Sequence, residues 1–267
     1  IVQHHTTGIL QPQVFPHGNW LLFPESLLPV LRSYVIKKGL LFPFVHIIII
    51  PMSINLVFLY SLIHKERGSV CMRLLEEYIE KYGNALNEDV LKVDAFLNHQ
   101  IDAQLMMELA KDFQEHFKDK HITKIATIET SGIAPAVMLG YLLQVPVVYF
   151  KKDTSRIMKD DLYTCQIHSF TKNKDYDIIC SKKYLSVEDH VLFLDDFMAN
   201  GEACLGGIEI LRQAGAIIEG IGIVIEKAFQ PGRSKVEALG YPVYSQARIA
   251  SLSQGRITFV SEEYQTV

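Results

Sequence analysis

Short apolar runs alternate with helix-like stretches along residues 124–226, and this alternation constrains the fold more than any other feature. The runs occupy 124–128, 146–150, 190–195 and 217–226, and the stretches at 133–143 and 202–214 are typical of helices. Strands that are apolar almost throughout must be covered on both faces, as in parallel sheets whose strands are joined by helices. The pattern predicts an α/β fold with a central, mostly parallel sheet.

The segments around this repeat complete the predicted fold. Residues 72–82 are expected to be helical, and Asp102 can cap a helix whose apolar residues follow at helical spacing. Alternation at 162–170 and 176–181 predicts two antiparallel strands, and a short helix near 232–239 precedes a final strand pair. Because ligands of such sheets bind where the strands end, we expect 129–132, 195–203 and 226–233 to meet there.

Composition changes sharply near residue 71. Residues 1–71 contain no Asp, only two Glu and six of the ten prolines, whereas 72–267 hold 28 of the 30 acidic residues. We interpret 72–267 as one domain and 1–71 as a separate N-terminal extension. Within the extension, Gly39 to Ile63 is a run of 25 residues without a formal charge, which is long enough to span a bilayer.

Three interpretations of residues 1–71 follow. In the favoured interpretation, residues 1–71 are a translation of nucleotide sequence that precedes the true start codon, and the native protein starts at Met72. The codons for Lys65 to Gly68 can form a purine-rich run like a bacterial ribosome-binding site, which would lie just before that start. An apolar membrane anchor and some other folded extension are the alternatives. Pro43 and Pro51 count against a membrane helix, since proline interrupts the helical hydrogen bonds.

Net charge and cysteine usage narrow the class of protein. A formal net charge of −4 gives no overall attraction to nucleic acid or to an anionic membrane. The four cysteines lie far apart, with no C-x-x-C pair and no His at metal-ligand spacing, which indicates free thiols in a reducing compartment. For residues 72–267 we expect a cytoplasmic protein that has no nucleic-acid partner, membrane contact or metal site of its own.

The segment LDDFMANGEA (194–203) places two adjacent carboxylates before an Asn-Gly turn that opens a helix. Unpaired N–H groups and the helix dipole at such a helix start can bind a phosphate. With Asp195 and Asp196 facing the vicinal hydroxyls of a sugar, the segment predicts a sugar-phosphate site. On these residues alone, a capped helix after a strand with one solvated Asp is the alternative.

This segment resembles the phosphoribosyl diphosphate (PRPP) motif of type I phosphoribosyltransferases. Four more segments are similar, in the same order, to bacterial xanthine phosphoribosyltransferases: LKVDAFLNHQID (91–102), TKIATIETSGIAPAV (123–137), GIGIVIEKAFQPGR (220–233) and SQARIASL (245–252). The similarity covers 72–267 and none of 1–71. It implies the type I phosphoribosyltransferase fold with a small base-binding hood. It also implies transfer of ribose 5-phosphate from PRPP to N9 of xanthine in purine salvage, giving xanthosine 5′-monophosphate (XMP) and diphosphate.

The resemblance assigns the donor side of the reaction to two segments. Asp195 and Asp196 are expected to orient the ribose as the catalytic pair. The turn that binds the departing diphosphate falls on Thr130, Ser131 and Gly132. The residues that bind PRPP fall on the loop and first helical turn after the aspartates: Ala199, Asn200, Gly201, Glu202 and Ala203.

The acceptor side is assigned to residues far from the PRPP motif. By resemblance, xanthine contacts fall on Leu91, Asn98 and Lys227. A lysine suits an acidic oxopurine, and an amide offers both a donor and an acceptor. On the residues alone, Lys227 reads equally as a solvated charge at a strand end, and Asn98 as a turn residue.

The resemblance further implies Mg²⁺ bound through the diphosphate of PRPP, a homodimer, and a lid formed by the polar stretch 151–161. Ser155-Arg156-Ile157 departs from the Ser-Leu-Thr run of the xanthine enzymes.

Two other functions stay open. One is transfer to guanine, hypoxanthine or adenine. The other is a PRPP-binding transcriptional regulator, although residues 1–71 lack the basic recognition helix of a winged-helix domain.

Overall fold

The computed structural model describes residues 73–153, 161–169 and 174–261. The interpretations of residues 1–71 and the departure at 155–157 lie outside these ranges. Within them, no helix is long and apolar enough to cross a membrane.

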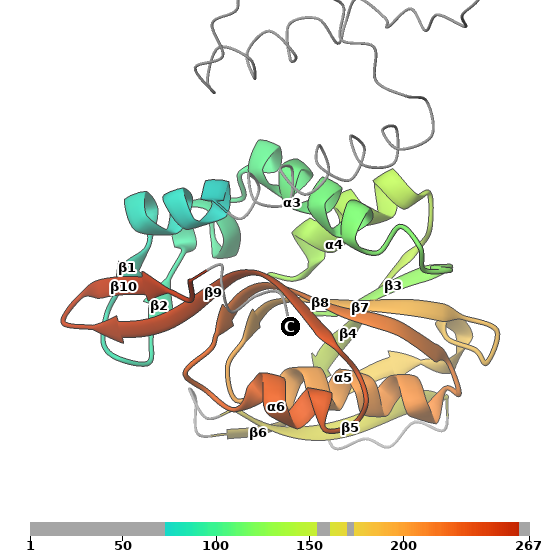
Figure 1. Ribbon diagram of the computed structural model, residues 1–267. Helices are drawn as coiled ribbons and strands as arrows, with labels where there is room; N and C mark the ends of the chain where they lie inside the picture. Colours follow the sequence, from blue (N-terminus) through green and yellow to red (C-terminus); the bar gives the residue numbers. More distant parts are fainter. Residues whose placement is uncertain (1–72, 154–160, 170–173, 262–267) are drawn as a thin grey trace, which may run out of the picture. The chain divides into compact units, whose positions relative to one another are not determined.

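One sheet of eight strands forms the centre of the fold, in the order β10-β9-β8-β7-β3-β4-β6-β5 (Figure 1). The five strands from β9 to β4 run parallel, and antiparallel partners extend both edges. The predicted parallel sheet and the predicted antiparallel pair are therefore confirmed. The strand bounds are β3 Lys124–Ile128, β4 Val147–Asp153, β5 Leu162–Ser169, β6 Lys174–Ser181, β7 His190–Met198, β8 Ile217–Lys227, β9 Val243–Ser253 and β10 Arg256–Phe259.

Helices cover both faces of this sheet (Figure 1). Helices α3 (Ala103–His116) and α4 (Ile133–Leu143) pack on one face, whereas α5 (Glu202–Gln213) and α6 (Gly232–Glu237) lie on the other. Asp102 caps α3 as predicted, because its carboxylate accepts hydrogen bonds from the backbone N–H groups of Gln104 and Leu105, both at 3.0 Å. Residues 73–82 are also helical.

The core divides into two apolar layers, one on each side of the sheet. Alternate residues of β7 enter opposite layers: Leu192 and Leu194 join the α3/α4 side, and Val191 and Phe193 join the α5 side. All four are fully buried. A strand buried on both faces is apolar throughout, which explains the runs that predicted this sheet.

Strand β7 extends further than the sequence indicated. The predicted run ends at Asp195, yet the strand continues through Met198 because Phe197 and Met198 still pair with β8. Both aspartates therefore lie inside the strand rather than at its end. Strand β4 likewise runs to Asp153, three residues past the predicted end.

A small substructure precedes α3. Strands β1 (Asn84–Ala85) and β2 (Leu91–Lys92) form a two-stranded antiparallel sheet, and a π-helical turn η2 follows at Asp94–Asn98. Figure 1 shows this hairpin beside β9 and β10. A short 3₁₀ turn η3 (Lys182–Tyr184) connects β6 to the loop before β7.

Candidate active site

Three loops gather at the carboxyl ends of β3, β7 and β8. These strands are parallel, with β7 pairing to both of the others. The turn 129–132 follows β3, the loop 199–201 follows β7, and 228–231 follows β8. The three segments expected to meet at one edge of the sheet therefore do so.

Asp195 and Asp196 differ in their exposure to solvent. Asp195 is only 5% exposed, whereas Asp196 is half-buried. The backbone N–H of Asp196 donates to Asp195 Oδ1 at 3.1 Å. Burial, followed by the negative charge of Asp196, raises the pKa of Asp195 well above its ordinary value, and burial also raises the pKa of Asp196. A cationic group or a hydrogen-bonding ligand at this edge would stabilise their ionised forms.

Lys152 at the end of β4 supplies positive charge near this pair. Its ammonium opposes the rise in pKa of both aspartates. The same side chain lies over the ring of Tyr176, with Nζ 5.5 Å from the ring centroid. The sequence interpretation placed Lys152 only at the start of a lid, because nothing in the spacing pairs it with residues more than forty positions away.

The turn after β3 lies beside Asp195. A Cβ built on Gly132 would meet the side chains of Thr127 and Asp195, at 2.2 Å from Oγ1 and 3.2 Å from Oδ1 respectively. Only a glycine fits between them, so the backbone of this turn approaches the carboxylate closely. Glu129 anchors the turn to the next strand, since its Oε1 accepts from the backbone N–H of Lys152 at 2.6 Å. Thr130 is exposed and Ser131 half-buried, so both hydroxyls can reach a ligand.

The loop after β7 forms a small cup. A cavity of about 140 Å³ is lined by the loop, by the first turn of α5, by His168 of β5 and by Tyr176 of β6. The predicted PRPP residues Ala199, Asn200, Gly201, Glu202 and Ala203 all line it. Gly201 is the N-cap of α5, and no side chain caps the helix there. The first N–H groups of a helix lack intrahelical partners, so they can donate to an anion in the cup.

Two glycines set the shape of this cup. Gly201 has φ 87°, in the left-handed region, and a Cβ on it would lie 2.9 Å from the Cα of Gly232. Gly232 in turn donates its N–H to Ala199 O at 3.0 Å. The loop after β7 is therefore packed directly against the start of α6, backbone on backbone, which a side chain at either position would prevent.

Lys227 ends β8 and reaches the hairpin before α3. Its Nζ donates to Asp89 O at 2.5 Å and lies 5.7 Å from the centroid of the Phe197 ring. Burial lowers the pKa of Lys227, and the charge of Asp89 partly offsets this. Gln230 donates to Asp89 Oδ1 at 3.4 Å, so the last residue of β8 and one residue of the following loop hold the same turn.

The other predicted base-contact residues lie on this hairpin and the turn after it. Leu91 is 6% exposed and belongs to the apolar layer under α3, whereas Asn98 ends η2 and is exposed. The structure brings the hairpin that carries Leu91 to Lys227 through Asp89. The roles of Leu91, Asn98 and Lys227 toward xanthine stay predictions.

A buried ionic network behind Lys227 escaped the sequence interpretation. Glu226 is 2% exposed and accepts two hydrogen bonds from Arg233, at 2.9 and 2.6 Å, and one from Arg248 at 3.2 Å. Burial would raise the pKa of Glu226, but these arginines and Ser245 lower it overall. The network fixes the loop between β8 and α6. Glu226 lies in β8 and Arg233 in α6, so their contact depends on the path of the loop between them and not on a periodicity within one element.

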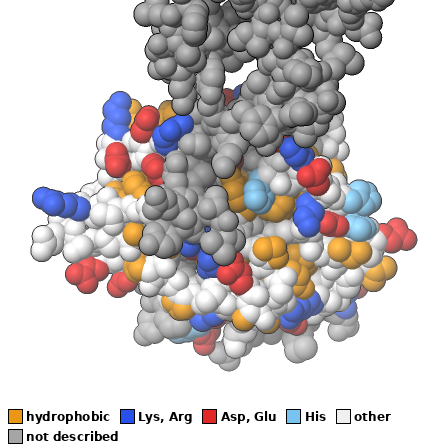
Figure 2. Space-filling view, viewed as in Figure 1, with side chains coloured by type: hydrophobic (Ala, Val, Ile, Leu, Met, Phe, Trp, Pro, Cys, Tyr) orange, Lys and Arg blue, Asp and Glu red, His pale blue; other side chains and the backbone are white. Residues whose placement is uncertain are grey.

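Charged side chains of both signs are mixed on the surface (Figure 2). On the face shown in Figure 2, Lys and Arg side chains are interspersed with Asp and Glu.

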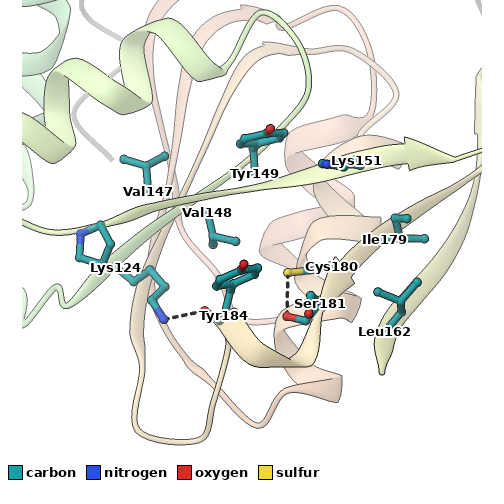
Figure 3. Close-up of a pocket in the computed structure, with 11 residues that line it drawn as sticks. Lys124, Val147, Val148, Tyr149, Lys151, Leu162, Ile179, Cys180, Ser181 and Tyr184 are labelled. Carbon is teal, nitrogen blue, oxygen red and sulfur yellow. Dashed lines mark hydrogen bonds between the residues drawn. The ribbon is translucent and has the colours of Figure 1, made fainter. Parts of the chain in front are cut away.

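A larger cavity, about 510 Å³, lies beside the first half of β4 (Figure 3). It is lined by Val147, Val148, Tyr149 and Tyr184, while Lys124 donates to Tyr184 O at 2.6 Å. It is separate from the loops at the carboxyl edge.

Comparison with known proteins decides the family. No protein-family model matches the chain. A xanthine phosphoribosyltransferase of Listeria innocua is 56% identical over 192 residues, which cover 72% of this chain and 100% of that protein. Xanthine phosphoribosyltransferase 1 of Clostridium botulinum (53%, covering 71% and 100%) and the xanthine phosphoribosyltransferase of Acinetobacter baylyi (54%, covering 72% and 100%) are similar to the same extent. The chain belongs to the xanthine phosphoribosyltransferase family.

Solved structures agree on the fold of this xanthine phosphoribosyltransferase family member. The adenine phosphoribosyltransferase of Giardia lamblia in complex with 9-deazaadenine is 26% identical, with a TM-score of 0.53 over 60% of this chain and 86% of that one. The adenine phosphoribosyltransferase of Saccharomyces cerevisiae shares 21% identity, with a TM-score of 0.55 over 67% and 99%. The predicted type I phosphoribosyltransferase fold is confirmed.

Proposed function

We propose that this member of the xanthine phosphoribosyltransferase family transfers ribose 5-phosphate from PRPP to N9 of xanthine, releasing diphosphate and forming XMP in purine salvage. One observation carries the donor assignment. A cup of backbone donors at the start of α5 directly follows two carboxylates, at the edge of the sheet where β3 also delivers its turn. The identity of the acceptor is supported by the relatives, at 53–56% identity.

The cup and the aspartates divide the work on the donor. Residues 199–203 would hold the 5′-phosphate through backbone N–H groups at the positive end of α5. Asp195 and Asp196 would hold the ribose hydroxyls next to it. The diphosphate would then lie toward Thr130, Ser131 and Gly132, because Gly132 is packed beside Asp195.

Transfer breaks the bond between C1′ and the diphosphate oxygen, forms the bond between C1′ and N9, and releases the N9 proton. Positive charge develops on the ribosyl centre as the diphosphate leaves, so catalysis depends on positioning and on nearby negative charge. The buried Asp195 and the half-buried Asp196 supply that charge. We assign no dedicated general base.

The acceptor site is proposed at Lys227, Asn98 and Leu91. Lys227 has three N–H donors, of which Asp89 O takes one, so donors remain for the ring carbonyls of xanthine. A cation there favours an acidic oxopurine over the amino group of adenine. Leu91 would contribute apolar contact from β2, and Asn98 both a donor and an acceptor.

Mg²⁺ is proposed to be carried by PRPP rather than by the protein. Among the described residues, no three His, Cys, Asp or Glu side chains are grouped as metal ligands. This fits an ion that takes its oxygen ligands mostly from phosphates and water. Bound there, Mg²⁺ neutralises charge on the departing diphosphate.

We further propose a homodimer in the cytoplasm. The dimer is implied by the resemblance alone, and light scattering of the purified protein tests it. Support for a reducing compartment comes from Cys165, Cys180 and Cys204, which are free thiols.

A base panel tests the function. Full-length protein is incubated with PRPP and Mg²⁺ and, separately, with xanthine, guanine, hypoxanthine or adenine, and the nucleotide product is quantified. We expect kcat/KM to be highest for xanthine and lowest for adenine. A higher kcat/KM for another base would overturn the acceptor, and no nucleotide from any base would overturn the reaction.

A further inference from the structure

Glu202 places a negative charge at the first position of α5, in the lining of the phosphate cup. A carboxylate at a helix start interacts favourably with the helix dipole, and so does a phosphate. The two anions therefore compete for the same positive helix end. If Glu202 acted alone, it would repel the phosphate that the cup is proposed to hold.

Lys235 removes this conflict. Its Nζ lies 2.8 Å from Glu202 Oε1, so the carboxylate is directed toward α6. The distance is set by backbone packing, because Gly232 donates its N–H to Ala199 O and lies against Gly201. Helix α6 and the phosphate loop therefore hold Lys235 and Glu202 in register.

The pair has little importance as an ordinary ion pair. The side chains of Lys235 and Glu202 are 38% and 31% exposed, and pairs with this exposure contribute only about 0–1 kcal/mol to folding. Its position gives it a different importance. Among the residues that the structure describes, the cation paired with the Glu202 carboxylate comes from α6, so an acid in the lining of the anion site is neutralised from outside the PRPP motif.

We propose that Lys235 is a positioning residue for PRPP: it pairs with Glu202 and thereby leaves the N–H groups of α5 to the 5′-phosphate. The inference rests on the proposed function for its ligand. Lys235 itself touches no reacting atom. It sets the charge of the cup that binds the sugar phosphate.

Among the described residues, the other charged groups near the cup do not take over this role. Lys152 on β4 lies over the ring of Tyr176, and its charge acts on Asp195 and Asp196. His168 on β5 hydrogen-bonds Asp175 Oδ1 at 2.6 Å. Asp195 on β7 is itself acidic and adds negative charge. Removing Lys235 therefore leaves the charge of Glu202 without the counter-ion that lies 2.8 Å from it.

Three variants separate charge from structure: Lys235→Ala, Glu202→Gln and the double variant. We measure the Kd for ribose 5-phosphate by calorimetry, which needs no turnover, and the KM values for PRPP and xanthine. Lys235→Ala is expected to weaken ribose 5-phosphate about tenfold, equivalent to about 1.4 kcal/mol. Glu202→Gln keeps the backbone N–H and removes the negative charge, so it is expected to strengthen ribose 5-phosphate binding, and the double variant is expected to bind more tightly than Lys235→Ala. The KM for xanthine should not change.

Two controls accompany them. Lys235→Arg keeps the cation and should restore binding. Lys111→Ala breaks a comparable exposed pair on α3, 2.7 Å from Glu108, and should leave both the Kd and the KM values unchanged. Because screening weakens partly exposed charges, the defect of Lys235→Ala should also shrink at high salt.

The signs of the effects decide the outcome. If the pair only held α6 in place, Glu202→Gln would weaken binding as much as Lys235→Ala does, and the inference would be wrong. Unchanged binding in Lys235→Ala would also overturn it, whether or not XMP is formed. The expected binding pattern in a protein that forms no XMP would support Lys235 and refute the proposed reaction.

Discussion

Substitution of Gly201 by Ala tests whether backbone packing shapes the phosphate cup. Gly201 and Gly240 share φ 87°, so an alanine at either position meets the same left-handed strain, roughly 1–2 kcal/mol. Their surroundings differ. A Cβ at Gly201 would lie 2.9 Å from Gly232 Cα and 3.2 Å from Gly232 O, whereas nothing lies within 4 Å of a Cβ at Gly240.

The difference between the two variants isolates the packing contact. Ordinary contact begins at 3.4 Å, so Gly201→Ala must move the loop by about half an ångström against the backbone of α6. We expect an extra loss of stability of about 1–3 kcal/mol beyond that of Gly240→Ala, as for an overpacked site. Each kcal/mol lowers Tm by about 2–4 °C in a domain of this size.

Catalysis should separate the two variants more clearly than stability. The same shift moves the N–H donors of residues 201–203 out of line, and hydrogen bonds to a charged group contribute about 1.5–3 kcal/mol each. The KM for PRPP is therefore expected to rise at least tenfold in Gly201→Ala, with little change in the KM for xanthine. In Gly240→Ala both KM values should stay at wild type. Equal PRPP kinetics in the two variants would refute the claim that contact with Gly232 shapes the cup.

Three further variants test the aspartate, the buried network and the base contact. Burial and the charge of Asp196 raise the pKa of Asp195, so its ionised form is unfavourable for folding above that pKa. Asp195→Asn should therefore raise Tm at pH 8, by a margin that stays constant above the raised pKa and shrinks only as pH falls through it toward the ordinary pKa of the unfolded chain. The same variant should lower kcat by roughly 10²-fold. A lower Tm at pH 8 would contradict this. Glu226→Gln leaves Arg233 and Arg248 without their buried counter-ion. The free energy of unfolding, measured by chemical denaturation, should fall by about 3–5 kcal/mol. A fall of less than about 1 kcal/mol would show that the network is dispensable. Lys227→Met should raise the KM for xanthine roughly 30-fold, equivalent to about 2 kcal/mol, without changing the KM for PRPP, and equal effects on both substrates would remove the lysine from the base site.

The sequence predicted the fold well where one segment determines its own structure. Helix α4 has the predicted bounds, Ile133–Leu143, and Asp102 caps α3 as expected. The apolar runs marked the parallel strands because burial on both faces leaves no alternation. Strand β7 was predicted too short, because polarity was taken as its end. Pairing with β8 continues past Asp195 regardless of side-chain polarity.

The place of the candidate site in the fold could be predicted from the sequence, but the contacts within it could not. LDDFMANGEA indicated a phosphate loop beside two carboxylates, and the structure places both at one edge of the sheet. The contacts of Lys235 with Glu202 and of Lys227 with Asp89 join residues 33 and 138 positions apart. Such pairs depend on how helices and loops pack in three dimensions, and no periodicity in the chain encodes them.

The tether between Lys227 and Asp89 has an evolutionary consequence. The proposed donor site is built from the strands and loops of the central sheet, whereas the proposed acceptor contacts come largely from one hairpin and the turn after it, 84–98. That hairpin is held at the sheet edge by Lys227 and Gln230. Exchange of this segment would therefore change the preferred nucleobase and leave the loops proposed to bind PRPP unchanged. On this arrangement, the hairpin proposed to contact the base can change while the loops proposed to bind PRPP keep their structure.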